Sequence, residues 1–410
     1  MRILRQYLGD AALVTMALVL SLHAAFTVST FGDYSGDGGP ALASLLHGNL
    51  RAFGQARPEM GDLSLLVRAP FAALAYLGHP TELNIYRWGV LPCVASVAIL
   101  GLWLAKIARS RGVGLGGQLM IVALSVFNPL TSTAITMGHP EELLTASLCV
   151  GALVAALKQR TVLTLMLLGL ALACKQWSVV AILPIVFALE RGRIRTLLGA
   201  VALAALITVP ELVSSPATYL RIQMSLALHH RAESSALSWW WPFAPNGTRY
   251  VLIEGTKVPV TLHRLPLQLV ESLHTVIITL DAVIAIIVAR IRGLPLRPND
   301  AFALMAVVML LRCALDTETM PYYHAALFLD LLAWDAFTAK RLPLRALSGA
   351  ALSWLLFDRF TPRFLGIAPA SILYGISAAA VLVLLLRTFI TASAPTRQHI
   401  VGNLSFSLLR

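Results

Sequence analysis

Apolar residues occupy this chain in long blocks that short polar turns separate, from one end of the sequence to the other. Such blocks suit the hydrocarbon core of a bilayer, which a helix of about 20 apolar residues crosses. The pattern predicts a polytopic, all-α integral membrane protein with about twelve transmembrane helices. The predicted spans cover residues 11–30, 87–106, 115–134, 141–157, 161–175, 177–190, 196–213, 266–289, 301–315, 323–338, 345–357 and 367–389.

Two connecting segments, 31–86 and 214–265, are much longer than the others and fall on the same side. In the first, Pro40 precedes apolar positions at helical spacing as far as Leu50, which predicts an amphipathic surface helix. The apolar stretch 63–78 is interpreted as a re-entrant or interfacial element, because a further span would reverse the charge bias of every later turn. We expect one transmembrane domain over residues 1–390, with its polar site in the two long segments, and a tail over 391–410.

The positions of the charged residues along the chain predict its orientation in the membrane. Only 13% of the residues are charged and 58% are hydrophobic, yet the formal net charge is +12. The basic residues cluster in the turns that share a side with the N-terminus, so the positive-inside rule predicts that both termini are cytoplasmic. Such anchoring against anionic lipid headgroups accounts for the net charge and gives no reason to expect a nucleic-acid partner. The main clusters are Lys106/Arg109/Arg111, Arg191/Arg193/Arg195, Arg290/Arg292/Arg297 and Lys340/Arg341/Arg345.

The sequence contains no phosphate-binding GxxxxGK[ST] loop and no GxGxxG after a strand. Its four cysteines all lie in apolar segments, without CxxC or metal-ligand spacing, and are interpreted as small core residues. A soluble nucleotide therefore has no predicted binding site here. Any group donor is expected to reach the protein from the membrane or from outside.

Two aspartates lie in the glycine-rich stretch FGDYSGDGGP at the start of the first long segment. An Asp before a helix commonly does no more than cap it. Two acids in one turn at the mouth of a membrane bundle also suit a polar reaction site. Asp33 and Asp37 are therefore the first candidates for chemistry, and their spacing does not choose between them.

A second polar turn, MGHPEELL, joins the third and fourth predicted spans. Pro140 followed by Glu141 and Glu142 is typical of a helix start, where acids complement the helix dipole. His139 is less easily explained by capping and is a candidate ligand or phosphate contact. Lys175, in ACKQW, falls on the side that the positive-inside rule depletes of lysine, so it must either snorkel to the interface or pair with an anion.

The last polar cluster lies in RCALDTETMPYYH, between two predicted spans. Arg312 near the end of one helix, and Tyr323 and His324 near the start of the next, place groups that can bind a phosphate at similar depth. The second long segment adds Arg231 upstream of three consecutive tryptophans. These tryptophans could stack on a sugar or line a lipid phosphate site, or they could form an interfacial aromatic belt.

Taken together, the Asp-bearing loop that leads to LLHGNL, GHPEELL, LLGLALACKQW with LPIVFALERGR, and LDTETMPYYH resemble the bacterial glycosyltransferase family 87 of the GT-C superfamily. The resemblance spans most of residues 1–340. It implies an inverting membrane glycosyltransferase that uses a polyprenyl-phosphate sugar, commonly mannose, on the outer face of the bacterial plasma membrane. The implied acceptor is a lipid or glycan of the cell envelope.

The resemblance also implies roles for the polar residues. An acid of the first outward loop would act as general base, here Asp37 or Asp33, because the acceptor hydroxyl must lose its proton. Positive and hydrogen-bonding groups would stabilise the departing lipid phosphate. The candidates for donor phosphate or sugar binding are His324, Arg312, Lys175, His139, Glu141, Tyr323 and Arg231.

Two other functions compete with this interpretation. A secondary transporter or lipid flippase suits twelve spans, and Asp281 and Asp330 lie within predicted spans as transporter acids do. A non-catalytic scaffold for envelope assembly would tolerate loss of Asp33, Asp37 and His324. No cofactor is predicted. Asp33, Asp37 and Glu141 could hold a divalent cation, but their spacing is no metal signature and no metal site is predicted.

Overall fold

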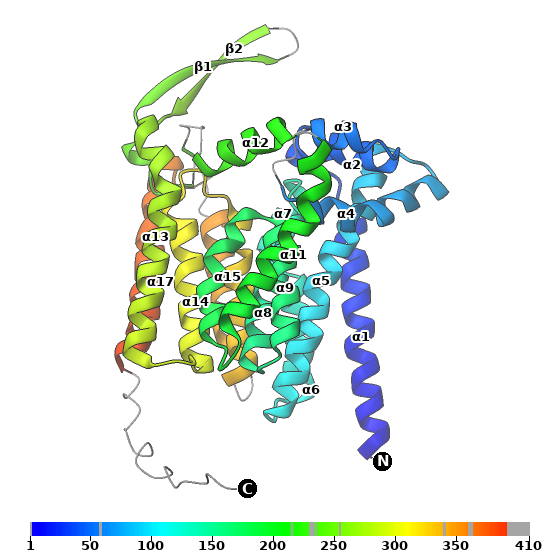
Figure 1. Ribbon diagram of the computed structural model, residues 1–410, viewed down its shortest axis with the longest axis vertical. Helices are drawn as coiled ribbons and strands as arrows, with labels where there is room; N and C mark the ends of the chain where they lie inside the picture. Colours follow the sequence, from blue (N-terminus) through cyan, green and yellow to red (C-terminus); the bar gives the residue numbers. More distant parts are fainter. Residues whose placement is uncertain are drawn as a thin grey trace, which may run out of the picture.

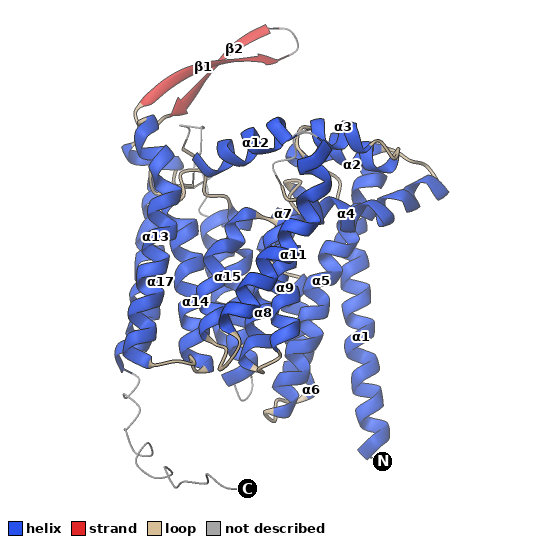
Figure 2. Cartoon of the chain, viewed as in Figure 1, coloured by secondary structure: helices blue, strands red, loops and turns tan. Residues whose placement is uncertain are grey.

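The computed structural model describes residues 2–56, 60–214, 216–228, 234–235, 237–253, 256–338, 342–359 and 364–391. Long helices run side by side between two ends, and shorter helices lie across one of them, at the top of Figure 1, which we call the capped end. The helices cover nearly all of the described chain, as Figure 2 shows. The predicted all-α fold is confirmed.

The helices of the bundle form at the predicted apolar blocks, and they bury many of their apolar side chains against one another. They are α1 (Arg2–Phe26), α5 (Glu82–Ser110), α6 (Leu115–Val126) with α7 (Pro129–Thr136), α8 (Glu141–Leu157), α9 (Thr161–Cys174), η3 (Gln176–Ala181) with α10 (Ile182–Phe187), α11 (Arg193–Ser214), α13 (Leu267–Arg292), α14 (Pro298–Leu315), α15 (Ala325–Thr338), α16 (Leu344–Trp354) and α17 (Ile367–Thr391).

The number of membrane spans differs from the prediction. Each predicted block contains helix, but only six helices of the described chain are long and apolar enough to cross a membrane. Several of the others are shorter than a perpendicular crossing requires. A membrane protein is supported, whereas twelve spans are not confirmed. The six are Tyr7–Phe26, Glu82–Ser110, Leu115–Thr136, Leu267–Arg292, Pro298–Leu315 and Ile367–Ile390.

Helix α1 begins and helix α17 ends at the same end of the bundle, opposite the capped end (Figure 1). Basic side chains there hold neighbouring helices together. Arg109 at the end of α5 pairs with Asp10 of α1. The Nε atom of Arg292 at the end of α13 lies 2.9 Å from an Asp300 carboxylate oxygen in the first turn of α14. Part of the basic excess therefore braces the helices.

The first long segment covers the capped end with short helices. These are η1 (Gly32–Ser35), α2 (Gly38–Leu46), α3 (Leu50–Gln55), α4 (Asp62–Ala72) and η2 (Ala73–Leu77), and α12 (Pro216–Leu228) lies across the same end (Figure 1). Helix α2 buries Ala41 and Leu42, but it ends at Leu46, and Leu50, the last of the predicted apolar positions, begins α3 and is exposed. The stretch 63–78 forms α4 and η2 instead of a span.

The second long segment contains a feature that the sequence interpretation missed. Strands β1 (Asn246–Ile253) and β2 (Thr256–His263) pair antiparallel, from Asn246 opposite His263 to Ile253 opposite Thr256. The hairpin projects beyond the helices at the capped end (Figure 2). The available signal was a Gly255 between two runs rich in β-branched residues, which is weaker than the apolar blocks around it.

Helix α4 meets the end of α9 at a glycine. The Gly61 N–H donates to the Cys174 carbonyl at 2.9 Å, and a Cβ atom on Gly61 would lie 2.1 Å from the Ala173 carbonyl oxygen. Gly61→Ala should therefore destabilise the protein by about 1–3 kcal/mol, because backbone must shift. Thermal unfolding in detergent measures this loss.

A matched control is Gly116→Ala on α6, where a Cβ atom meets nothing within 4 Å. Alanine in a helix is favoured over glycine by about 0.5–1 kcal/mol, so this variant should be neutral or slightly more stable. Equal unfolding temperatures for the two variants would contradict the proposed clash at Gly61.

Candidate functional site

Two glycine turns meet at the capped end and bring the first acidic loop to the HPEELL turn. The Asp33 N–H donates to the Met137 carbonyl at 3.1 Å. Gly138 has a φ of +94°, and a Cβ atom there would lie 2.4 Å from the Phe31 carbonyl oxygen. Both the conformation and the contact require glycine. As a result, Asp33 lies beside His139.

Glu141 is the centre of the polar cluster. Its side chain is fully buried at the start of α8. Its Oε1 atom lies 3.1 Å from His139 Nδ1 and 3.3 Å from Lys175 Nζ, and its Oε2 atom lies 3.7 Å from Arg68 Nη1. A solvent-exposed capping acid needs none of these partners. Three basic groups from three parts of the chain therefore compensate one buried carboxylate.

Glu142 extends the cluster toward α14. The Trp177 indole N–H donates to Glu142 Oε2 at 2.8 Å, and Lys175 Nζ lies 3.6 Å from Glu142 Oε1. Arg312 Nη2 lies 4.0 Å from Glu142 Oε2. The Arg312 guanidinium also lies over the rings of Trp177 and Tyr323, at 4.4 and 4.5 Å from their centroids. This arrangement holds a cation among aromatic faces.

Both candidate bases lie near the same imidazole. Asp33 Oδ2 is 3.7 Å from His139 Nε2, and the Asp33 side chain is 71% exposed. Asp37 precedes α2 without a side-chain capping hydrogen bond, and its carboxylate belongs with His139 and Glu141 to a group whose ligand atoms lie within 4.8 Å of one another. The structure thus places both aspartates at the cluster.

The group of Asp37, His139 and Glu141 has the residue types of a metal site. Glu141, however, already faces Lys175 and Arg68 at 3.3 and 3.7 Å. A divalent cation would be repelled by both of these charges. The expectation that no metal takes part therefore stays a prediction, now with an electrostatic reason.

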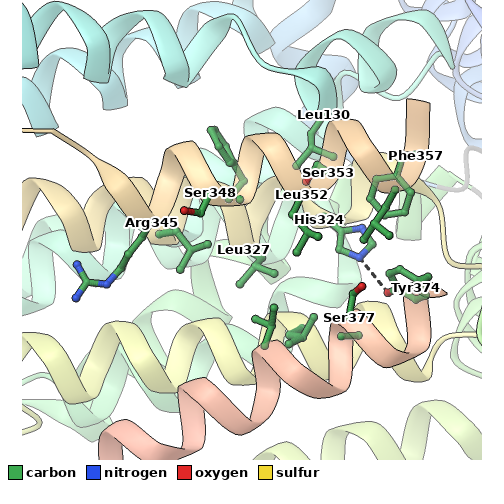
Figure 3. A pocket seen from close by; sticks show the side chains of 17 residues that line it. Leu130, His324, Leu327, Arg345, Ser348, Leu352, Ser353, Phe357, Tyr374 and Ser377 are labelled. Carbon is green, nitrogen blue, oxygen red and sulfur yellow. Dashed lines mark hydrogen bonds between the residues drawn. The ribbon is translucent and has the colours of Figure 1, made fainter. Parts of the chain in front are cut away.

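His324 lies apart from this cluster. Its Nδ1 atom is 3.1 Å from the Pro321 carbonyl oxygen, and its Nε2 atom is 3.0 Å from the Tyr374 hydroxyl of α17. The ring lies at one end of an apolar cavity of about 190 Å³, shown in Figure 3, whose walls come from α7 and from α14 to α17. Leu130, Leu327 and Leu352 are among its lining residues.

This cavity nevertheless begins at the same turn as the cluster. His324 ends η5 (Pro321–His324), and Tyr322 in that turn stacks on His139 with ring centroids 4.8 Å apart. Tyr323 in the same turn covers Arg312. A molecule with a charged head and an apolar tail could therefore contact the cluster and the cavity together.

The second long segment contains the remaining candidates, Arg231 and the three tryptophans. Arg231 lies outside the described residues. The tryptophans of the second long segment contact protein: Trp240 Nε1 donates to the Leu315 carbonyl at 2.8 Å, and Trp241 stacks on His263 with centroids 3.7 Å apart. Trp240 thereby fastens this segment over the end of α14, and Trp241 holds the segment to its own strand β2.

Sequence reasoning missed Arg68. Its side chain is fully buried, with its guanidinium 5.3 and 5.9 Å from the ring centroids of Tyr34 and Tyr86. None of its side-chain nitrogens has a hydrogen-bond partner in the described chain, so Glu141 is its anionic partner there. The available signal was a single arginine inside the apolar stretch 63–78.

His139 lies in the turn between α7 and α8. Burial opposes its protonation, but the hydrogen bond and negative charge of Glu141 outweigh burial and raise the pKa of His139 above its usual value. The imidazole is therefore more readily protonated than a free histidine. A protonated His139 adds positive charge between Asp33 and Glu141.

Comparison with protein families gives one match. Residues 63–191 match the family described as alpha-(1->6)-mannopyranosyltransferase, N-terminal domain. Searches among curated proteins and among solved structures give no significant match. The matched residues include α4, α8, α9 and Lys175, and hence most of the charge cluster.

The match covers less than half of the chain. It supports a mannosyltransferase of the GT-C type, and hence a glycosyltransferase activity, while the specific resemblance to glycosyltransferase family 87 is not confirmed. The portion that it matches contains the HPEELL turn and ACKQW on which the sequence resemblance depended.

Removing the Arg68 charge should leave the buried Glu141 carboxylate with less positive charge to compensate it. Because breaking one side of a buried ion pair leaves an uncompensated charge, Arg68→Leu should cost about 3 kcal/mol or more of unfolding free energy. The double variant with Glu141→Gln should lose less than the sum of the two single losses. Unfolding in detergent measures all three.

Arg51→Leu is the matched control, since Arg51 is exposed on α3 at the same end, and we expect little change there. Strictly additive losses for Arg68 and Glu141 would show that the two side chains do not interact.

The raised pKa of His139 makes a pH-dependent contribution to stability. This contribution is fully present below the unfolded-state pKa, about 6.5, and is lost as pH rises through the higher folded-state pKa. The unfolding temperature of the wild type should therefore exceed that of His139→Gln most at acidic pH, and the gap should narrow as pH rises. A gap independent of pH would contradict the pairing of His139 with Glu141.

Proposed function

We propose that this protein is an inverting membrane mannosyltransferase. It transfers the sugar of a polyprenyl-phosphate donor to a lipid or glycan acceptor, with Asp37 or Asp33 as general base, at the outer face of the bacterial plasma membrane. The observation that carries the proposal is the cluster in which acids and bases of the first outward loop, the HPEELL turn and ACKQW meet. The family match over 63–191 supports the mannosyl group.

The proposed reaction separates into two charge changes. The acceptor hydroxyl oxygen attacks the anomeric carbon of the donor sugar, and its proton passes to the aspartate carboxylate. The bond between the anomeric carbon and the phosphate oxygen breaks, and polyprenyl phosphate leaves with that electron pair. The loss of the acceptor proton needs a carboxylate to receive it, and the negative charge that develops on the departing phosphate needs nearby cations.

The cluster contains both kinds of group. Asp33, 71% exposed, offers a carboxylate that an acceptor can reach. Lys175 and Arg312 lie 3.6 and 4.0 Å from carboxylate oxygens of Glu142, and the Arg312 guanidinium lies beside the Tyr323 ring. We assign these two cations to the departing phosphate, with His139 between the base and the phosphate.

The apolar cavity beside His324 suits the lipid chain of the donor. Leucine is the commonest of its lining residues, with two phenylalanines and three serines beside it, and it extends along α15 and α17 from the turn that ends at His324 (Figure 3). A polyprenyl chain gains free energy by burying its surface in such a cavity. We therefore place the isoprene units nearest the phosphate there, with the Tyr374 hydroxyl close to the phosphate end.

A transporter or flippase remains the second candidate, because of two buried acids. Asp281 on α13 and Asp330 on α15 are buried, and neither carboxylate has a hydrogen-bond partner in the described chain. Buried acids of this kind occur in proton relays of transporters. Uptake of a labelled polyprenyl-phosphate sugar into proteoliposomes that depends on Asp281 and Asp330, without sugar transfer, would favour this function.

Substitution of the candidate bases tests the enzyme. Purified protein in lipid is offered radiolabelled polyprenyl-phosphate mannose and native membrane lipids, with wild type, Asp33→Asn and Asp37→Asn compared. The asparagine that replaces the base should lower the rate by about 10²–10⁴-fold, since general base catalysis contributes that much. Product analysis asks whether the new linkage is α-(1→6), and a chelator should leave the rate unchanged.

Glu271→Gln, at the outer end of α13 beyond the described cluster, is the matched control and should keep its activity. Full activity in both aspartate variants would exclude them as bases. No transfer by wild type with several polyprenyl-phosphate sugars would argue for the transporter.

A further inference from the structure

A second cavity lies on the side of α7 away from the apolar cavity beside His324. The proposed binding of the donor does not involve it. It has a volume of about 630 Å³ and lies between the end of α1, the segment that follows it, α6 with α7, and residues Trp354 and Asp358. Unlike the cavity beside His324, it is lined by many polar side chains. They include Thr27, Ser29, Ser132, Thr136, Trp354 and Asp358.

Several lining hydroxyls can serve a ligand as hydrogen-bond acceptors. Thr27 donates its hydroxyl proton to the His23 carbonyl at 2.8 Å, and Thr136 donates to the Ser132 carbonyl at 3.0 Å. Each hydroxyl oxygen then keeps lone pairs for a ligand, because its only proton is engaged. The Asp358 carboxylate adds a further acceptor. The matching ligand is one that carries several hydroxyl donors.

An aromatic side chain adds a surface on which a sugar ring can stack. Trp354 at the end of α16 is 40% exposed and lines the cavity. An indole face can cover the apolar C–H face of a sugar ring while hydroxyls at the ring edge bond to polar neighbours. The described lining residues include Asp358 and no Lys or Arg, so this part of the lining favours a neutral ligand with hydroxyl groups over a phosphate.

The cavity is continuous with the charge cluster along the chain. Ser29 precedes Asp33 by one short turn, and Thr136 directly precedes Met137, whose carbonyl accepts the Asp33 N–H at 3.1 Å. Helix α7 separates the two cavities: Leu130 lines the apolar one, whereas Thr131 and Ser132 line the polar one. A sugar in the polar cavity therefore lies near Asp33, on the side away from the lipid cavity.

We propose that this polar cavity is a carbohydrate-binding site that takes neutral hexose units and, in the proposed transfer, holds the acceptor glycan. The assignment to an acceptor rests on the proposed function, whereas saccharide binding itself does not. Recognition comes from acceptor oxygens of Thr136 and Asp358 and from the Trp354 ring. The donor sugar remains with the charge cluster and the lipid cavity.

Direct binding tests the site. The probe is the methyl glycoside of an α-(1→6)-linked mannotriose, measured by saturation-transfer NMR and titration with full-length protein in nanodiscs. Wild type should bind it. Thr136→Val and Asp358→Asn should each weaken binding by about tenfold, since each removes or weakens hydrogen bonds to the sugar. Trp354→Leu should weaken binding as well, and Trp354→Phe should restore part of it.

Ser44→Ala is the matched control for Thr136. The Ser44 hydroxyl also donates to a helix carbonyl, that of Pro40 at 2.9 Å, on an exposed face at the capped end. This variant should bind the trisaccharide as wild type does. Unfolding temperatures of all variants show whether a loss of binding comes from misfolding.

Transfer kinetics separate this inference from the proposed function. With mannotriose as acceptor, the cavity variants should raise the acceptor KM by about tenfold and leave the donor KM unchanged. Wild-type transfer with an unchanged acceptor KM in every cavity variant would overturn the inference while the function stands. Saccharide binding that the cavity variants abolish, without any transfer by wild type, would support the site and overturn the function. Absence of probe binding by wild type would overturn the site.

Discussion

The buried Glu141 carboxylate determines how the capped end of this protein is built. A carboxylate removed from water costs several kcal/mol unless nearby positive charges compensate it. Here the compensation comes from His139, Lys175 and Arg68, which belong to the turn before α8, the end of α9 and helix α4. These three elements must therefore meet at one point. The geometry of the site follows from satisfying this charge.

Aromatic rings let the neighbouring cations stay charged in this environment. Arg68 lies between Tyr34 and Tyr86, and Arg312 lies against Trp177 and Tyr323. Ring faces supply negative potential without adding anions, so positive charge can exceed what the two glutamates neutralise. Such a site can accept a further anion. In the proposed reaction, this anion is the departing phosphate.

The sequence predicted much of this site, because several of its parts are local. Pro140, Glu141 and Glu142 predict a helix start. Lys175 on the side depleted of lysine predicts a nearby anion, and the structure places its Nζ atom within 4 Å of the carboxylates of both glutamates. Arg68 was missed since the stretch around it reads as an apolar element, and only its packing against Glu141 reveals a role. His324 was assigned to the phosphate by depth along the helix, but its ring faces Tyr374, a contact 50 residues away that no local pattern encodes.

Helix α7 is short, and its position between two unlike cavities explains how one site could handle two unlike substrates. Leu130 lines the apolar cavity and Ser132 the polar one, so opposite faces of the same helix present an apolar surface and a hydroxyl-rich surface. The helix ends at Thr136, two residues before Gly138. A glycosyl group that passes from a lipid to a sugar needs such a boundary, because the donor chain favours an apolar environment whereas the acceptor hydroxyls favour hydrogen-bond partners. Glycine at position 138 lets the loop that carries Asp33 pack against the end of this helix, because any side chain there would collide with that loop.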